Sequence, residues 1–192
     1  MRGPDYRAAE RGSPATGYNI PMRSLPLPQT LTGLLASARF RVEGDSMCPT
    51  LWHGQQVLAR RVPSPGAALQ RGEVVVLRHT ADSQRIFIKR VIGLPGEHLR
   101  LAQDAVYVND LPLAEPYLDG PPCPVGRSPR QWIMGPEEYF VLGDRRSDSQ
   151  DSRAFGPVGH EMILGRVWFR CWPPRSWGQV PPPGAVSRSR QS

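Results

Sequence analysis

The sequence predicts a mostly β protein whose core is a curled antiparallel sheet or barrel, with a smaller β domain inserted in it. Two observations lead to this fold class. First, 22 prolines and 19 glycines supply 41 of the 192 residues, which favours many turns over long helices. Second, short apolar runs recur at short intervals with turn residues between them. Hydrophobic residues make up 39% of the chain, which is enough for a folded core.

Seven apolar segments have the length and composition of strands. The strongest is Val74–Leu77, which follows a Gly-Glu turn. The fourth segment ends at the turn Gly93-Leu94-Pro95-Gly96, and Asn109-Asp110 after the fifth predicts a hairpin turn. The seven segments are 40–42, 57–59, 74–77, 85–92, 106–108, 139–142 and 166–172.

Residue composition divides the chain into four parts. Residues 1–38 hold five prolines and many small residues, so we expect a flexible arm with a short helix over Thr30–Ala38. Residues 39–96 and 138–174 carry most of the strands and form the predicted β core. Residues 97–137 form the predicted inserted β domain, and residues 175–192, with a proline triplet and Ser-Arg repeats, are expected to be a disordered tail.

Charge and cysteine content exclude several classes of protein. The net charge is +7, from 24 basic and 17 acidic residues, which suits an anionic membrane surface. No run of five basic residues marks a nucleic-acid tail, so we expect no nucleic-acid partner. The three cysteines form no CxxC pair and the four histidines lack ligand spacing, so neither a disulfide framework nor a metal or other cofactor is expected. No apolar run is long enough for a transmembrane helix.

Lysine is the rarest basic residue, since 23 of the 24 basic residues are arginine and the single lysine is Lys89. Side chains alternate across a strand, so Lys89 shares its face with Phe87 and Val91. Apolar neighbours disfavour the ammonium form and lower its pKa. A neutral lysine can act as a general base near neutral pH, whereas arginine stays charged.

Two polar segments supply candidate partners for this lysine. Ser46 lies in the turn Gly44-Asp45-Ser46-Met47-Cys48-Pro49, where a serine is exposed and can be a nucleophile if a base lies next to it. No Gly-x-Ser-x-Gly motif points to a Ser-His-Asp hydrolase, and a Ser-Lys pair follows the same chemical logic. The second segment, residues 143–153, is dense in Asp, Ser and Arg and predicts a hydrogen-bonded loop.

Together these three segments resemble the bacterial type I signal peptidases, the serine-lysine proteases that remove leader peptides. The resemblance lies in Ser46-Met47-x-Pro49-Thr50-Leu51, in Lys89-Arg90-Val91-Ile92-Gly93-Leu94-Pro95-Gly96-Glu97 and in the box at residues 143–153. It covers the chain from about Phe40 to Pro174 in the family's order.

The resemblance implies a role for each matching residue. Ser46 would be the nucleophile and Lys89 the general base. Ser149 would orient the lysine amine, and Asp151 with Arg153 would brace the loop. The backbone N–H of Ser46 would serve the oxyanion hole, with Gly44 standing where many members carry a second donor. For the shallow apolar pockets that the family uses to read a small-x-small motif, our candidate linings are Met47 and Ile86.

The chain departs from the family pattern at several points. Arg145 replaces an asparagine, and Gln55 replaces an aspartate, which we expect to weaken a turn. The family carries a transmembrane anchor ahead of the nucleophile, and none is visible here. Trp168 and Trp172 alternate with arginines on one predicted face of the last strand, which suits a bilayer interface.

The implied function is cleavage of leader peptides from secretory precursor proteins, at a membrane and on its extracytoplasmic face. Two alternatives stay open: a maturation protease of the same superfamily acting on one precursor, and a self-cleaving, repressor-type Ser-Lys protein that regulates DNA. The second needs an N-terminal helix-turn-helix, for which residues 1–38 hold too many prolines. The stretch Ala36-Ser37-Ala38 also suggests a cleavable leader or self-cleavage after Ala38.

Overall fold

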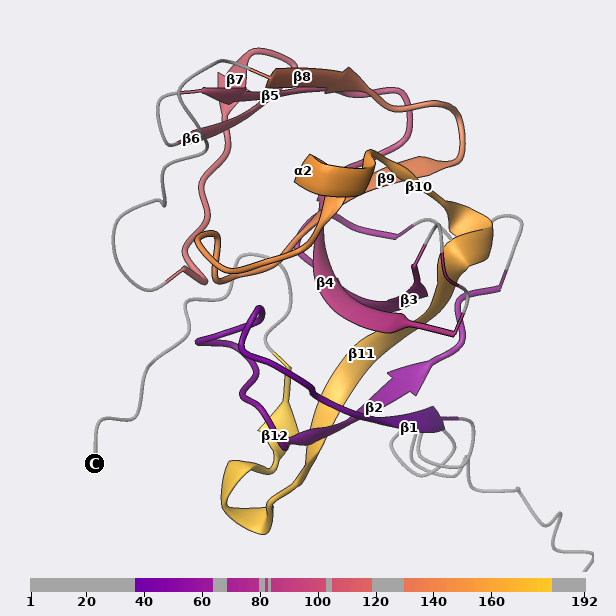
Figure 1. Ribbon diagram of the computed structural model, residues 1–192, viewed down its shortest axis with the longest axis vertical. Coiled ribbons are helices and arrows are strands. Elements are labelled where there is room, and N and C mark those ends of the chain that lie inside the picture. The colour runs from indigo at the N-terminus through magenta and orange to yellow at the C-terminus, as the bar shows by residue number, and fades with distance from the viewer. Residues whose placement is uncertain are drawn as a thin grey trace, which may run out of the picture.

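The computed structural model describes residues 37–63, 69–79, 82, 84–102, 105–118 and 130–180. Strands are the main regular structure among them, and the helical elements are short (Figure 1). The elements are β1 (Ser37–Arg41), β2 (Gln56–Arg60), β3 (Val74–Arg78), β4 (Ile86–Gly93), β5 (His98–Ala102), β6 (Ala105–Val108), β7 (Leu111–Pro112), β8 (Arg130–Ile133), β9 (Glu138–Leu142), α2 (Ser152–Phe155), β10 (Val158–Gly159), the 3₁₀ turn η1 (His160–Met162), β11 (Ile163–Trp172), the 3₁₀ turn η2 (Pro174–Ser176) and β12 (Gly178–Gln179).

The main sheet is antiparallel throughout, in the order β1-β2-β11-β3-β4-β9-β10, with β12 paired to β11. It curls strongly, so that β1 and β2 come to lie across from β4 (Figure 1). Among the described residues β1 does not pair with β4 or β10, so the sheet is curled and open rather than a closed barrel. The predicted mostly β fold with antiparallel sheets is confirmed.

Apolar side chains pack against both faces of the central strands β3 and β4. One cluster joins buried residues of β2 and β3 with Met47 and Leu51 from the loop after β1. A second cluster lies on the other face of β3 and β4 and includes Val75, Leu77 and Val91. A fully buried aliphatic side chain contributes about 1.5–3 kcal/mol to folding. These clusters therefore fix the strands that carry the polar residues of interest.

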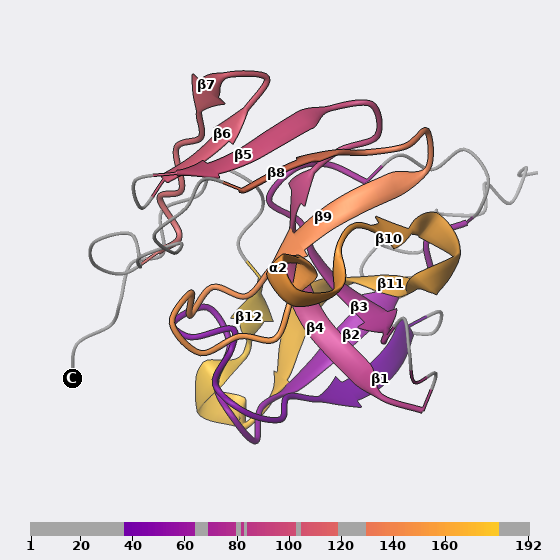
Figure 2. The same ribbon diagram turned by 45° about the horizontal axis from the view of Figure 1, so that its top comes forward.

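Residues 98–133 contribute a second antiparallel sheet, in the order β7-β6-β5-β8. Asn109 and Asp110 have φ values of 49° and 65°, which is the backbone of a tight hairpin turn and confirms the predicted turn between β6 and β7. This sheet lies across the end of the β4–β9 pair (Figure 2). Its inner face shares a core with Ile92 and Phe140 of the main sheet. The division of the chain into a core and an inserted domain stays a prediction.

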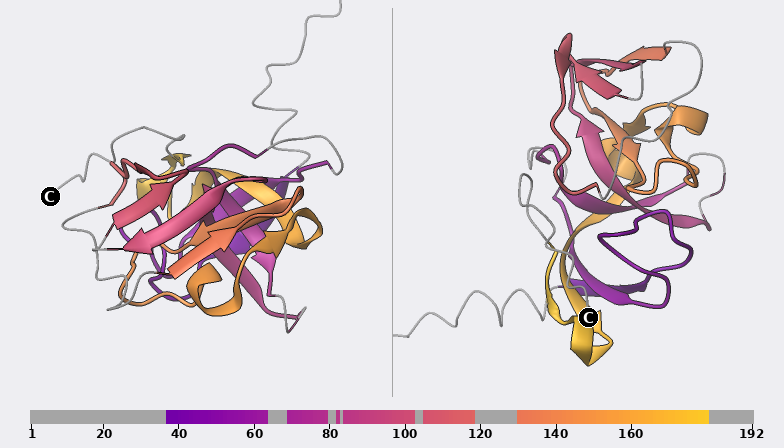
Figure 3. Two further views of the ribbon diagram at one scale, coloured as in Figure 1. Left: turned by 90° about the horizontal axis from the view of Figure 1, so that it is seen from above. Right: turned by 90° about the vertical axis from the view of Figure 1, so that its left-hand side faces the viewer.

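Both ends of the core extend further than the sequence predicted. Ser37 and Ala38 belong to β1 and pair with β2, so the expected helix is wrong at these two positions. At the other end η2 and β12 follow β11, and Val180 is buried in the first cluster, so a disordered tail from residue 175 is also wrong. Figure 3 shows this end of β11 far from the second sheet. The remainder of the predicted arm and tail, residues 1–36 and 181–192, lies outside the described residues.

The last long strand does not keep the simple alternation expected of it. Two β-bulges in β11 add one residue each opposite β2, after Val167 and after Arg170. Each bulge changes the face on which the following side chains lie. Trp168 therefore packs under the guanidinium of Arg60, 4.2 Å from the ring centroid, and its indole N–H donates to Ser37 Oγ. Trp172 is 51% exposed, so the two tryptophans do not have a common environment.

Candidate active site

Ser46 lies in a loop that closes directly after β1. The N–H of Val42 donates to the carbonyl of Gln55 at 2.8 Å, so the β1–β2 hairpin holds both ends of the loop together. Met47 and Leu51 are 1% and 0% exposed and belong to the core inside the curl. Val42 precedes Ser46 and belongs to the same core, so buried apolar side chains on both sides of Ser46 hold its hydroxyl at the edge of the core.

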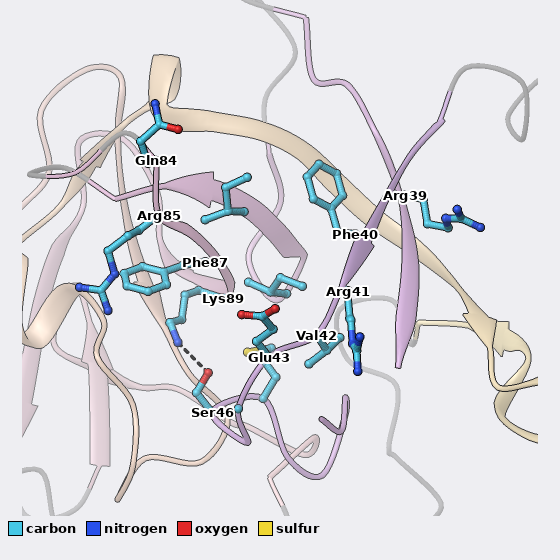
Figure 4. Close-up of a pocket in the computed structure, with 14 residues that line it drawn as sticks. Arg39, Phe40, Arg41, Val42, Glu43, Ser46, Gln84, Arg85, Phe87 and Lys89 are labelled. Carbon is cyan, nitrogen blue, oxygen red and sulfur yellow. Dashed lines mark hydrogen bonds between the residues drawn. The ribbon is translucent and has the colours of Figure 1, made fainter. Parts of the chain in front are cut away.

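Lys89 lies on β4 and points toward this loop. Its Nζ atom lies 2.7 Å from Ser46 Oγ, which is hydrogen-bond distance (Figure 4). The lysine is only 3% exposed, and its amine lies 5.3 Å from the ring centroid of Phe87. The structure thus brings together the two residues that the sequence singled out as nucleophile and base.

Burial changes the acidity of this amine. Removal from water lowers the pKa of Lys89 from 10.5 to about 8. The carboxylate of Asp151 acts in the opposite direction, and the guanidinium of Arg153 lowers the pKa further. The net effect leaves a usable fraction of neutral amine near neutral pH.

The loop at residues 143–153 folds around the Asp151 carboxylate. That carboxylate accepts the Gly143 N–H at 3.0 Å and the Arg153 guanidinium at 2.8 and 2.9 Å, and it caps the N-terminus of α2. Burial alone would raise the pKa of Asp151, but the hydrogen bonds and charge of Arg153 and the Gly143 N–H lower it. The loop also reaches the nucleophile, since the Arg145 N–H donates to the Ser46 carbonyl at 2.9 Å.

Ser149 does not make the contact that was expected of it. Its hydroxyl is buried in this loop but forms no hydrogen bond with the Lys89 amine. It packs instead against Gly143, where a Cβ atom would come within 2.1 Å of Ser149 Oγ. The expected orienting hydrogen bond is therefore wrong for this arrangement of the site, because the lysine amine is directed at Ser46.

The two candidate oxyanion donors differ in their surroundings. Gly44 has a left-handed φ of 74°, and its N–H donates to Nδ1 of His53 at 3.0 Å. The Ser46 N–H donates to no group in the described part of the chain. Only the Ser46 N–H is thus free for an incoming oxygen. The sequence assigned no role to His53, and its nine-residue separation from Gly44 gave no signal.

A groove of about 740 Å³ runs along the Ser46–Lys89 pair. It lies between the chain at residues 39–44 and the start of β4 (Figure 4). Both candidate lining residues, Met47 and Ile86, border it. Met47 contributes to the buried floor, whereas Ile86 is 48% exposed at the rim. Val42 and Ile88 add apolar surface between them.

The two departures from the expected pattern each have a structural counterpart. The guanidinium of Arg145 lies 3.5 Å from the carboxylate of Asp45, the residue directly before the nucleophile. Gln55 does not weaken its turn, because its side-chain oxygen accepts the Trp52 N–H at 3.1 Å. A longer amide thus makes the type of hydrogen bond that a carboxylate would make.

Sequence reasoning missed a buried ion pair behind the dyad. Arg90 is 1% exposed, and its guanidinium binds the Asp144 carboxylate at 2.8 and 2.6 Å. It also donates to the Gly72 carbonyl and to Thr50 Oγ1. With 23 arginines in the chain, Arg90 did not stand out. The signal that could have found it is its place next to Lys89 on the opposite face of a buried strand.

Two negative findings concern the described ranges alone. They contain no group of three or more His, Cys, Asp or Glu side chains that could bind a metal ion. None of their helices has the length and apolar character needed to cross a membrane. The bond after Ala38, suggested as a self-cleavage site, lies within β1 where it pairs with β2, so the strand would have to leave the sheet before cleavage.

Most of the chain is similar to known proteins of one family. Residues 30–172 match the family described as signal peptidase, peptidase S26. The chain belongs to this family. Signal peptidase IB of Staphylococcus aureus strain COL is 33% identical over 162 residues, covering 74% of this chain and 82% of its own length. Probable signal peptidase I-2 of Synechocystis is 36% identical over 149 residues, covering 72% of this chain and 64% of its own length.

A solved structure is also similar to this member of the signal peptidase family. The crystal structure of a signal peptidase I from Enterococcus faecalis V583 is 28% identical, with a TM-score of 0.45, and covers 55% of this chain and 97% of its own. As a member of the peptidase S26 family, the protein is a serine endopeptidase. The resemblance that the sequence suggested is confirmed.

Proposed function

We propose that this signal peptidase family member cleaves N-terminal leader peptides from secretory precursor proteins, with Ser46 as nucleophile and Lys89 as general base. One observation carries the proposal: the buried Lys89 amine lies 2.7 Å from Ser46 Oγ. A serine hydroxyl needs an adjacent base to become reactive, and a lysine with a lowered pKa is one. The similarity to signal peptidase IB supports leader peptides as the substrate class.

The chemistry proceeds in two steps. The neutral Lys89 amine takes the proton of Ser46 as Oγ attacks the scissile carbonyl, and the resulting ammonium protonates the departing amine. The acyl group then remains on Ser46. The neutral lysine next takes a proton from water, which attacks the ester carbonyl. The ester C–O bond then breaks, the leader peptide leaves with a new carboxyl group, and the lysine returns the proton to Ser46 Oγ.

Negative charge develops on the carbonyl oxygen during both attacks. The Ser46 N–H, which has no acceptor in the described part of the chain, is the donor best suited to stabilise it. The Gly44 N–H would first have to leave His53, to which it donates at 3.0 Å. We therefore assign the main oxyanion role to the Ser46 N–H and leave Gly44 a supporting role at most.

The groove has the geometry for an extended peptide. On one side lies β1, an edge strand, and on the other lies the first half of β4, since β9 pairs only with the second half, from Arg90 to Gly93. Four successive antiparallel pairings separate β1 from β4, so the two edges run in the same direction. A peptide that enters between them, with its carboxyl end toward Ser46, can add a strand parallel to both.

The same geometry explains a preference for small side chains near the cut. In an added strand, alternate residues point to the same face. The face toward the curl meets Met47, Val42 and Ile88, which leave shallow apolar space next to the dyad. We infer that this surface, with Ile86 at the rim, reads the small-x-small motif.

A membrane-facing surface is part of the proposal. Trp172 and Trp177 are 51% and 62% exposed at the far end of β11, and Arg175 lies between them in sequence. Exposed tryptophans beside arginines suit the interfacial region of an anionic bilayer. We propose that this end contacts the membrane surface, with the active site on the extracytoplasmic side where leader peptides emerge.

The test is cleavage of a leader-peptide substrate by wild-type protein and by the Ser46→Ala and Lys89→Ala variants. We expect cleavage after the small-x-small motif by the wild type alone. Ser176→Ala is a suitable control, because it removes a serine hydroxyl that donates to the Pro173 carbonyl after the end of β11. Full activity of either dyad variant would refute the mechanism, and cleavage of unrelated peptides at equal rate would refute the substrate class.

A further inference from the structure

Two residues in the segment that follows β7 contact side chains next to the active site. They lie outside the three segments that carry the family resemblance. They are Glu115 and Tyr117. The segment that follows β7 descends from the second sheet toward the loop at residues 143–153 (Figure 1). Tyr117 is 6% exposed, and the Glu115 side chain is 9% exposed. The proposed mechanism uses neither of them, yet both are buried polar groups with specific partners.

Glu115 binds a buried cation. Its carboxylate accepts the Arg146 guanidinium and also the Tyr117 hydroxyl. The Arg146 side chain is 4% exposed, so its charge depends on this carboxylate for compensation. Burial together with the charge of Glu115 raises the pKa of Tyr117, which keeps the hydroxyl protonated as a donor.

Tyr117 covers a second buried cation. Its ring lies 3.9 Å below the guanidinium carbon of Arg90, a cation–π contact. Arg90 follows Lys89 on β4 and holds the Asp144 carboxylate and Thr50 Oγ1. Thr50 belongs to the nucleophile loop. Tyr117 thus packs on the group that joins the base strand, the nucleophile loop and the start of the 143–153 loop.

Arg146 connects Glu115 to the loop that contacts the nucleophile. Its Nε donates to the Gly143 carbonyl at 3.1 Å, and its own carbonyl accepts the Arg153 guanidinium at 2.7 Å. Between them the Arg145 N–H donates to the carbonyl of Ser46. Glu115 is therefore connected to Ser46 through Arg146 and the N–H of the neighbouring Arg145.

We propose that Glu115 and Tyr117 are positioning residues for the dyad, because they hold Arg146 and Arg90 and thereby fix the loop and the strand that set the Ser46–Lys89 contact. This inference rests on the proposed function. The segment after β7 then contributes to catalysis and does not only join the two sheets.

The pH profile distinguishes positioning from simple structural support. The charged groups that act on the Lys89 amine are Asp151, Arg153, Asp144 and Asp148, and all four lie in the 143–153 loop. If that loop loosens, water reaches the amine and its pKa moves back toward its ordinary value. A variant that only lowers the folded fraction would lose activity at every pH by the same factor.

The experiment compares Tyr117→Phe and Glu115→Gln with the wild type by kcat, KM and the pH dependence of kcat/KM, all per folded molecule as judged by near-UV circular dichroism. Displacements of about 1 Å cost about 10²-fold in rate, so we expect kcat at pH 7 to fall about tenfold for Tyr117→Phe and about 10²-fold for Glu115→Gln. KM should change little, and the acidic limb of the profile should move to higher pH.

Matched controls come from the same protein. Tyr107→Phe alters another tyrosine under an arginine, since Arg100 lies 4.1 Å from its ring centroid in the second sheet. Glu137→Gln alters an exposed carboxylate directly before β9. Both controls should keep the wild-type profile.

An unshifted profile in both Tyr117→Phe and Glu115→Gln, with wild-type kcat per folded molecule, would overturn the inference. Should Glu115→Gln fail to fold, Tyr117→Phe still decides, because it keeps the ring over Arg90 and removes one hydroxyl. A wrong assignment of Ser46 and Lys89 as the dyad would be recognised separately, because Ser46→Ala or Lys89→Ala would then retain activity.

Discussion

The amine of Lys89 lies 2.7 Å from the hydroxyl oxygen of Ser46, although 43 residues separate them in the chain. A strand delivers the lysine and a loop anchored in the core delivers the serine. The contact joins two groups that are each weak catalysts alone. Because burial lowers the pKa of the amine, more of it is neutral and able to accept a proton near neutral pH, and the serine gains reactivity from this base.

The first prediction concerns the identity of the base. Lys89→Arg retains a positive charge and nearly the same length, but arginine cannot give up its proton. Loss of general-base catalysis should reduce kcat by at least about 10²–10⁴-fold while the fold persists. Peptide cleavage and circular dichroism measure the two effects.

Arg78→Lys is the control for this exchange, because Arg78 is an exposed residue on β3 opposite Ile86. It should keep full activity. If Lys89→Arg cleaved the substrate at more than about a tenth of the wild-type rate, the general-base role would be wrong.

The second prediction concerns pH. Only neutral Lys89 can accept the Ser46 proton, and the pKa of this lysine is lowered to about 8 by burial. As the pH falls below about 8 the ammonium form accumulates, so kcat/KM should drop about tenfold per pH unit and should level off above that value. If Lys89 had the ordinary lysine pKa of 10.5, this drop in kcat/KM would begin near pH 10.5.

This pH dependence is tested by measuring kcat/KM between pH 6 and a little above pH 10, with a substrate that has no titrating groups. A profile that still rises steeply above pH 10 would contradict the buried, neutral amine. A flat profile would show that Lys89 does not lose a proton in the reaction.

The third prediction concerns close packing at Gly143. A Cβ atom there would lie 2.1 Å from Ser149 Oγ and 2.6 Å from the Ser46 carbonyl oxygen, both far inside contact distance. Gly143→Ala must therefore push the loop away from the nucleophile. We expect about 1–3 kcal/mol of lost stability and about 10²-fold lower kcat, measured by thermal unfolding and peptide cleavage.

Gly135→Ala is the matched control. Its Cβ would meet only the flexible Glu138 side chain, at 3.1 Å or more, and that side chain can move. An active Gly143→Ala enzyme with wild-type kcat would mean that the loop and the nucleophile are not coupled as the structure indicates.

The fourth prediction concerns the membrane. The double change Trp172→Ala and Trp177→Ala removes two exposed rings and should weaken binding to vesicles that contain anionic lipid by about tenfold or more, since each ring contributes buried apolar area. Trp168 is left in place because it packs against Arg60 and Ser37. Vesicle sedimentation gives the bound fraction.

Ile133→Ala serves as its control, because this residue is 76% exposed on the second sheet, away from β11. It should bind vesicles like the wild type. Equal binding by the double tryptophan variant would exclude this end of the molecule as the contact surface.

The sequence alone determined the chemistry of the dyad and seven of the twelve strands in the described residues, but it did not reveal β5, β7, β8, β10 and β12. Apolar alternation around Lys89 already placed this lysine among buried neighbours, and turn residues marked the loop of Ser46 and the hairpin at Asn109. These features are local, since they depend on residue type and on spacing within a few positions. The scarcity of lysine pointed to the same residue.

Only the tertiary structure decided which groups meet. The partnership of Arg90 with Asp144 and Tyr117 joins segments far apart in sequence. The hydrogen bond of the Gly44 N–H to His53 and the missing hydrogen bond between Ser149 and the lysine amine also depend on tertiary packing. Two bulges in β11 changed which tryptophan faces solvent, because one extra residue reverses the alternation of a strand. Such pairings follow from how the sheet curls, which no local pattern of residues encodes.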